Sequence, residues 1–148
     1  MSSRQELLQL VDSRLRRATT AIDGLDHRAA LIFGVNRTDL RLLILLVGQG
    51  PLTAGALARA VGISTGGMTI ALDRLEQAGY VRREPNAKDR RSVVVRVTDR
   101  IAAPSRQAFG PLQRRLTTVL RAYQPEQLEL LAELLDSWVD AVEEALRS

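Results

Sequence analysis

The first part of the chain carries apolar side chains at every third or fourth position, which is the spacing of a helix with one apolar face. The series begins with Leu8, Val11 and Leu15 and continues to Ile32. A regular alternation of three and four is a heptad seam, the pattern through which helices pack along their length. We therefore expect one long helix over residues 4–33, ended by the glycine that follows it.

Between this helix and Gly79, the helical spacing returns in three shorter stretches that are separated by glycines. Each stretch follows a threonine or a serine, whose side chain can accept a hydrogen bond from the free N–H groups of a first helical turn. Gly79 can end the last stretch. We expect helices over residues 39–47, 53–61 and 64–78, with Thr38, Thr53 and Ser64 as their caps.

After Gly79 the period of the apolar positions changes from helical to two, which is typical of strands with one buried face. Residues 80–84 and 92–97 follow this pattern, and the second run places three alternate valines on one face. The polar residues 85–91 between them read as a loop. We expect a β-hairpin with a basic tip.

The remaining residues return to helical spacing. Thr98 can cap the next helix, but Pro104 and the pair Gly110-Pro111 interrupt its early part, so we expect a kink or a late start. Pro125 suits the first turn of a last helix, which carries an apolar seam of its own.

This order of elements predicts a mainly α fold with a small β-hairpin wing, namely a winged helix-turn-helix flanked by long N- and C-terminal helices. The short third helix braces the fourth, and the fourth fits the major groove of DNA, which is wide enough to admit a helix. We expect residues 1–36 to form an N-terminal dimerisation helix, residues 37–99 the DNA-binding domain, and residues 100–148 the C-terminal dimerisation helices.

The charge of the chain is unevenly distributed. Its formal net charge is +4, and 20 of its 21 basic residues are arginines. Residues 124–148 are strongly acidic, whereas residues 82–100 hold a cluster of arginines. A basic patch beside an acidic end fits a polyanion-binding region with a separate solvated region.

The predicted fourth helix begins with small and hydroxyl-bearing residues. Two successive glycines are costly inside a helix, and close approach to DNA is one explanation for them. Arg74, further along the helix, points near the DNA or pairs with an acid in the wing. The residues expected to contact DNA from this helix and the first strand are Ser64, Thr65, Gly66, Gly67, Thr69, Arg74 and Arg82.

The hairpin tip has the sequence Lys88-Asp89-Arg90-Arg91 and is the sharpest local signal for DNA binding. An arginine gains from the enhanced negative potential of a narrow minor groove. Phosphate would repel Asp89 unless it has another role, and we expect it to pair with an arginine and support the wing. Lys88, Arg90 and Arg91 are the expected DNA contacts.

Several short motifs occur together across the helix-turn-helix and the wing. They are Leu57-Ala58-Arg59, Ser64, Thr69, Asp73-Arg74-Leu75-Glu76, Gly79-Tyr80-Val81-Arg82-Arg83, Asp89-Arg90-Arg91-Ser92 and Val97-Thr98. In these motifs the chain resembles the MarR family of bacterial regulators over about residues 38–100. The resemblance implies an obligate homodimer that binds DNA, usually as a repressor, and whose affinity a small phenolic or other lipophilic ligand often lowers.

Two departures from the family pattern affect this interpretation. The position after Thr69 is often arginine in the family but is Ile70 here, which argues against base readout by a long basic side chain at that point. A glycine that commonly follows the motif ending in Thr98 is also absent, so the start of that helix is expected to differ.

The apolar seams of the first and last helices would be exposed on isolated helices. They pack either within one subunit or also across a two-fold axis, and the resemblance favours the second arrangement. A dimer would place two recognition helices about 34 Å apart, one turn of the duplex, to match a palindromic operator. The predicted interface residues are Leu8, Val11, Leu15, Leu128, Leu131, Leu135, Trp138 and Val142.

Other classes of function find little support in the sequence. His27 is the only histidine, and with Phe33 it is a candidate for an effector pocket, although packing is the simpler role for both. The chain has no cysteine, so it can form no disulfide or thiolate metal site, and we expect no metal and no cofactor. No catalytic set of residues stands out, so we expect no enzyme. A winged helix that serves only protein contacts is the alternative.

The sequence shows no signal peptide and no membrane span, and we expect a cytoplasmic protein.

Overall fold

The computed structural model describes residues 3–147, which fall into two compact units divided between Phe109 and Gly110. The division coincides with the Gly110-Pro111 pair that was expected to interrupt a helix. Each unit is described by itself. The first unit contains the helix-turn-helix and the hairpin, and it extends beyond residues 37–99 on both sides.

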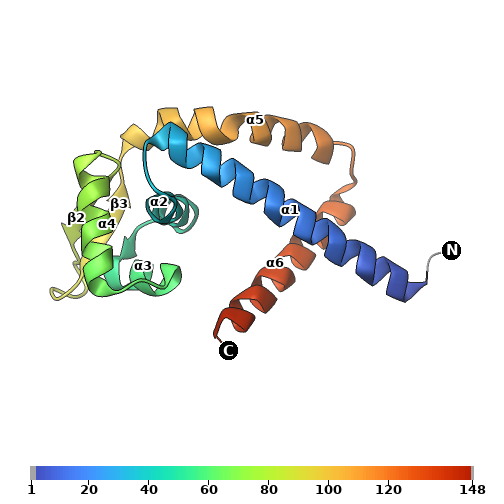
Figure 1. Cartoon of the computed structure of the whole chain (residues 1–148), viewed down its shortest axis with the longest axis horizontal. Helices are drawn as coiled ribbons and strands as arrows, with labels where there is room; N and C mark the ends of the chain where they lie inside the picture. Colours follow the sequence, from blue (N-terminus) through green and yellow to red (C-terminus); the bar gives the residue numbers. More distant parts are fainter. Residues whose placement is uncertain (1–2, 148) are drawn as a thin grey trace. The chain divides into compact units, whose positions relative to one another are not determined.

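The first unit contains four complete helices, the beginning of a fifth and a small sheet (Figure 1). They follow the expected order, with bounds that differ by a few residues. The elements are α1 (Arg4–Phe33), α2 (Arg37–Gln49), β1 (Leu52–Thr53), α3 (Ala54–Val61), α4 (Thr65–Gln77), β2 (Val81–Pro85) and β3 (Val93–Val97).

The helix caps confirm most of the local predictions. Thr53 and Ser64 accept hydrogen bonds from the main-chain N–H groups of Ala56 and Gly67, at 3.1 Å each. The prediction for α2 was wrong, because Asn36, and not Thr38, is its cap. The Asn36 side chain accepts a hydrogen bond from the N–H of Asp39 at 2.8 Å, so the helix begins two residues earlier than expected.

The sheet has a strand that the sequence analysis missed. β2 and β3 form the expected antiparallel hairpin, with Val81 opposite Val97 and Pro85 opposite Val93. The two-residue strand β1 pairs with the other edge of β3, which places the strands in the order β1-β3-β2. Two residues are too few to show a period, so no pattern could have indicated this strand.

The core of the first unit lies where α2, α3 and α4 meet the sheet and the end of α1. The buried faces are those that the helical spacing predicts, since apolar residues recur every three or four positions. Phe33 is also buried in this core, and its ring meets that of Tyr80 edge-on at 5.4 Å. The larger core side chains are Leu40, Leu42, Leu43, Leu46, Leu57, Met68, Leu72, Leu75, Val81 and Val95.

The helix after the hairpin starts late, behind a 3-10 turn, but it runs without a break through Pro104 and the Gly110-Pro111 pair, which were expected to interrupt it. Thr98 caps a single 3-10 turn, Asp99–Ile101, by accepting a hydrogen bond from the N–H of Arg100. The helix α5 (Ala102–Leu120) follows and includes Pro111. In the second unit, the last helix is α6 (Pro125–Arg147), which begins at the proline expected in its first turn.

Candidate DNA interface

The helices α3 and α4 form a helix-turn-helix. Their axes meet at 108° across a break of three residues, Gly62 to Ser64. Gly62 ends α3 with a φ of 74°, in the left-handed region. A crossing of about 90–120° over such a turn is typical of DNA-binding helix pairs. The following hairpin β2–β3 packs beside α4, so one surface presents both a helix and a wing (Figure 1).

The two faces of α4 differ sharply. Met68, Leu72 and Leu75 are buried against the core. The opposite face is open to solvent and carries small or polar residues together with one large apolar side chain; it consists of Gly66, Thr69, Ile70, Asp73 and Gln77. We call these five residues the outward face of α4.

The hydroxyl groups at the start of α4 are partly engaged within the helix. Ser64 is occupied as the cap, and the Thr69 hydroxyl donates a hydrogen bond to the carbonyl of Thr65 at 3.1 Å. The first residues of this region are nevertheless exposed to solvent, namely Ser64, Thr65, Gly66 and Thr69. Their role as DNA contacts remains a prediction.

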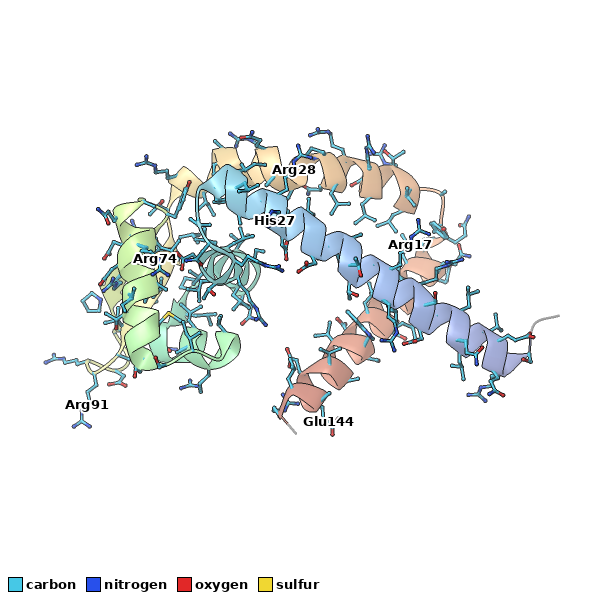
Figure 2. The ribbon with its side chains drawn as sticks, in the orientation of Figure 1. Arg17, His27, Arg28, Arg74, Arg91 and Glu144 are labelled. Carbon is cyan, nitrogen blue, oxygen red and sulfur yellow. The ribbon has the colours of Figure 1, made fainter. Side chains whose placement is uncertain are left out.

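Arg74 was expected either to point near the DNA or to pair with an acid in the wing; it pairs with an acid, but with one on α2. Its guanidinium donates two hydrogen bonds to the two carboxylate oxygens of Asp39 on α2, at 2.9 and 2.7 Å. Asp39 is 2% exposed, whereas the side chain of Arg74 is about half exposed. These hydrogen bonds raise the pKa of Arg74. Arg74 therefore holds α4 against α2 (Figure 2).

The connection between the wing and α4 is made by Arg83 of β2, which the sequence analysis did not single out. Its guanidinium forms an ion pair with Asp73 and lies 3.5 Å from a carboxylate oxygen of Glu76. Its main-chain N–H also donates to Glu76 at 3.1 Å. The acids of the motif Asp73-Arg74-Leu75-Glu76 and the double arginine after Val81 could have suggested this pairing.

Asp89 supports the wing tip, but by a different contact from the expected one. Its carboxylate accepts a hydrogen bond from the main-chain N–H of Arg91 at 2.9 Å, and its carbonyl accepts from the N–H of Ser92 at 3.1 Å. The expectation that it pairs with an arginine side chain was wrong, because the tight turn brings the main chain of Arg91, and not its guanidinium, to the carboxylate. Asp89 thus shapes the loop without neutralising a base.

The basic side chains at the tip project into solvent. Lys88, Arg90 and Arg91 are exposed, and within residues 3–147 none of the three has an ion pair at 4.0 Å or less. Figure 2 shows Arg91 extending from the end of the hairpin, away from the body of its unit. The tip therefore keeps its full positive charge available to a polyanion.

Arg82, by contrast, is engaged along the strands of the wing. Its guanidinium lies 2.7 Å from Glu84, which also accepts a hydrogen bond from Arg96 on the neighbouring strand at 3.2 Å. The hydrogen bond from Arg96 and the charges of both arginines lower the pKa of Glu84. Because Glu84 neutralises part of this charge, Arg82 is a weaker candidate for DNA contact than the tip residues.

A cavity of about 520 Å³ lies beside α2 in the first unit. Its lining includes Leu40, Ile44, Leu45, Val61 and Ile63, together with Asp26, Arg37, Thr38 and Arg41. Burial raises the pKa of Asp26, and the charge of Arg37 opposes that shift. Neither His27, which is exposed, nor Phe33, which is in the core, belongs to this lining.

The predicted interface residues lie partly on exposed surface. In the first unit Leu8 and Val11 are more than half exposed and Leu15 is partly buried. In the second unit no described residue of α6 is buried. The members of its seam range from partly buried to about half exposed; they are Leu128, Leu131, Leu135, Trp138 and Val142.

Two further searches covered the described residues. Residues 3–147 bring together no group of three His, Cys, Asp or Glu side chains that could hold a metal ion. No single helix in that range is long and apolar enough to cross a membrane; the bent pair of α3 and α4 reaches that length and composition only when taken together.

Comparison with known proteins identifies relatives along the whole chain. A sequence model described as the MarR family matches residues 33–92. The uncharacterized HTH-type transcriptional regulator YcgE of Bacillus subtilis (strain 168) is 36% identical over 145 residues, which cover 98% of this chain and 94% of the relative.

Solved structures agree with this relationship. Sco3205, a MarR family transcriptional regulator from Streptomyces coelicolor solved in complex with DNA, is 25% identical, with a TM-score of 0.60 over 96% of this chain and 94% of its own. RV1404 from Mycobacterium tuberculosis shares the fold, with 20% identity and a TM-score of 0.68 over 95% of this chain and 97% of its own.

Proposed function

Because the chain belongs to the MarR family of winged helix-turn-helix transcriptional regulators, we propose that it binds double-stranded DNA sequence-specifically as a homodimer and represses transcription. The observation that carries this proposal is the free basic wing tip beside an exposed recognition helix. The proposed function is therefore binding and not catalysis, and the proposed location of the protein is the cytoplasm.

In the proposed complex, α4 enters the major groove with its outward face toward the base edges. The main-chain N–H groups at its start and its helix dipole favour phosphate at that end. Ser64, Thr65 and Gly67 lie there, and Gly66 and Thr69 follow on the outward side. Arg74 contributes by holding the helix in place, since Asp39 occupies its guanidinium.

The wing would reach the adjacent minor groove. Arg90 and Arg91 are the candidates for insertion, because a narrow minor groove concentrates negative potential, and Lys88 is placed to contact the backbone. Asp89 supports this arrangement through its hydrogen bond to the main chain of Arg91, which leaves the arginine side chain extended.

Replacing Arg91 by alanine should weaken DNA binding by about 1–3 kcal/mol per contact, which is roughly 5- to 150-fold. The reason is the loss of a cation that no acid within the described residues neutralises. A shift assay at several salt concentrations measures it, and the slope of affinity against salt should become shallower because fewer counterions are released.

Arg106→Ala is the matched control, since Arg106 is an exposed arginine on α5 outside the wing. It should leave both affinity and salt slope close to those of the wild-type protein. Equal affinities of the wild-type protein and Arg91→Ala would contradict the proposed contact of the wing with DNA. A flat salt dependence of the wild-type protein would favour a winged helix that serves only protein contacts.

A homodimer would present two copies of α4 to one face of the duplex. A separation of about 34 Å between the two helices matches one turn of DNA and hence a palindromic operator. The exposed apolar positions on α1 and α6 support this assembly, because such seams are costly to leave in water.

The effector site that we propose is the cavity beside α2, which replaces His27 and Phe33 as the candidate. Its volume of about 520 Å³ lies in the range of small-ligand sites, and apolar walls with Arg41 suit a small lipophilic or phenolic acid, while Arg37 is paired with Asp23. Hydroxybenzoate should raise the melting temperature of the protein and weaken DNA binding, and Ile44→Glu should abolish both effects.

Gln49→Glu introduces the same charge at the end of α2, outside the cavity lining, and should preserve the response. A wild-type protein whose melting temperature and DNA affinity are both unaffected by hydroxybenzoate would contradict the proposal.

A further inference from the structure

Ile70 is a large apolar side chain in the middle of the outward face of α4. It is 58% exposed, and it packs neither in the core nor among the side chains that surround the core. The predicted dimer residues lie on α1 and α6, so they do not account for it. A single exposed isoleucine is ordinary on a protein surface, and a second observation is needed to give it a function.

The second observation is Gly66, which lies one helical turn before Ile70 on the same face. A Cβ added at Gly66 would meet no atom of the chain within 4 Å, and its φ lies outside the left-handed region. Neither packing nor backbone conformation therefore requires glycine, although glycine weakens a helix. The missing side chain leaves room for something outside the chain to approach α4 closely.

Of the polar side chains on the outward face, Asp73 and Thr69 are engaged within the protein, and Gln77 lies at the far end of α4, two turns after Ile70. Asp73 is paired with Arg83, and the Thr69 hydroxyl donates its hydrogen bond to Thr65. The outward face has no lysine or arginine, and the nearby Arg74 is held by Asp39. This surface has a paired acid, an exposed isoleucine and a glycine with free space around it. It therefore favours apolar contact over hydrogen bonds from long polar side chains.

We propose that Ile70 is a specificity-determining residue that packs against the C5-methyl group of a thymine in the major groove. Of the four bases, only thymine displays a methyl group there, and apolar side chains recognise it by contact. This inference rests on the proposed binding of DNA through α4. Because Gly66 has no side chain, the helix can come close enough to the DNA for this contact.

The test compares thymidine with deoxyuridine, which differs from it only by the missing methyl group on the base. The wild-type protein first selects duplexes from a random library, and one selected duplex is then resynthesised with deoxyuridine at each symmetric pair of thymines in turn. Removing one buried methyl contact should weaken wild-type binding about fourfold per half-site, or about 15-fold for both, at one such pair.

Ile70→Ala should bind the thymine duplex more weakly than the wild-type protein and should no longer distinguish thymine from deoxyuridine at that pair. Alanine is the better helix former and the site is exposed, so this variant should fold. Val47→Ala, which also removes apolar atoms from a 58% exposed side chain, but on α2 and outside the cavity lining, should keep the full discrimination. Gly66→Ala should weaken binding without lowering the melting temperature.

Three outcomes would overturn the inference while leaving DNA binding intact. They are a wild-type protein indifferent to deoxyuridine at every position, an Ile70→Ala variant that still discriminates, and a Gly66→Ala variant that binds with full affinity. If the wild-type protein selects no duplex from the library, the proposed function itself fails together with the inference.

Discussion

Replacing Leu135 by aspartate should dissociate the proposed dimer and abolish tight DNA binding. Leu135 is 45% exposed in the single chain and belongs to the apolar seam of α6. A charge placed in a dry interface costs several kcal/mol. We therefore expect dimerisation to weaken by at least about 3 kcal/mol, or 100-fold. Sedimentation velocity measures the assembly, and a shift assay on a palindromic duplex measures the loss of the second half-site.

The control is Ser137→Asp on the same helix. Ser137 lies toward the acidic side of α6, and its hydroxyl donates only to the carbonyl of Glu133 in the preceding turn. The added charge there should leave the dimer intact. A Leu135→Asp variant that sediments with the same mass as the wild-type protein would refute the proposed interface, as would a wild-type chain that is itself a monomer.

Replacing Arg74 by methionine should destabilise the first unit strongly. The carboxylate of Asp39 is buried, and its side-chain hydrogen bonds both come from Arg74. Without that guanidinium it becomes a buried charge with no counter-ion, which costs about 3 kcal/mol. Methionine preserves much of the side-chain volume, so the loss reports the charge and not a cavity. Urea unfolding measures it as a lower midpoint with an unchanged slope.

A double-mutant cycle separates this effect from a loss of packing. Asp39→Asn alone should cost less than Arg74→Met, because the half-exposed arginine can be hydrated while the buried carboxylate cannot. Adding Asp39→Asn to Arg74→Met should recover most of the lost stability, since the buried charge is gone. If the two losses in the free energy of unfolding simply add in the double variant, the two side chains are not coupled.

The ion pair of Arg74 and Asp39 also positions the helix that we propose to bind DNA. Asp39 lies in the first turn of α2, where the helix dipole favours a carboxylate. Arg74 connects it to α4, and Arg83 connects α4 to the wing. The orientation of the recognition helix and that of the wing are therefore set by two arginines whose charges are satisfied inside the protein. The basic side chains that we propose to contact DNA lie instead at the hairpin tip.

Much of the local structure could be predicted from the sequence, because it depends on neighbouring residues. The caps at Thr53 and Ser64 each bond to a main-chain group three residues away, and the change of period after Gly79 marks the start of the hairpin. Where a local signal failed, at Thr38, a better capping residue stood two positions earlier at Asn36. Competing caps lie close in energy, so helix starts shift easily.

By itself, the sequence determined the order of the helices and the hairpin, the buried face of each helix, and the basic tip of the wing. Only the tertiary structure decided which charges remain free. Arg74 and Asp39 are 35 positions apart and meet because the core packs α4 against α2. The sequence does not distinguish Arg82, Arg83 and Arg91, but the structure pairs the first two with acids and, within residues 3–147, forms no ion pair with the third. The arginines along the strands of the wing are paired with acids, so the proposed contact of the wing with DNA falls mainly to its tip.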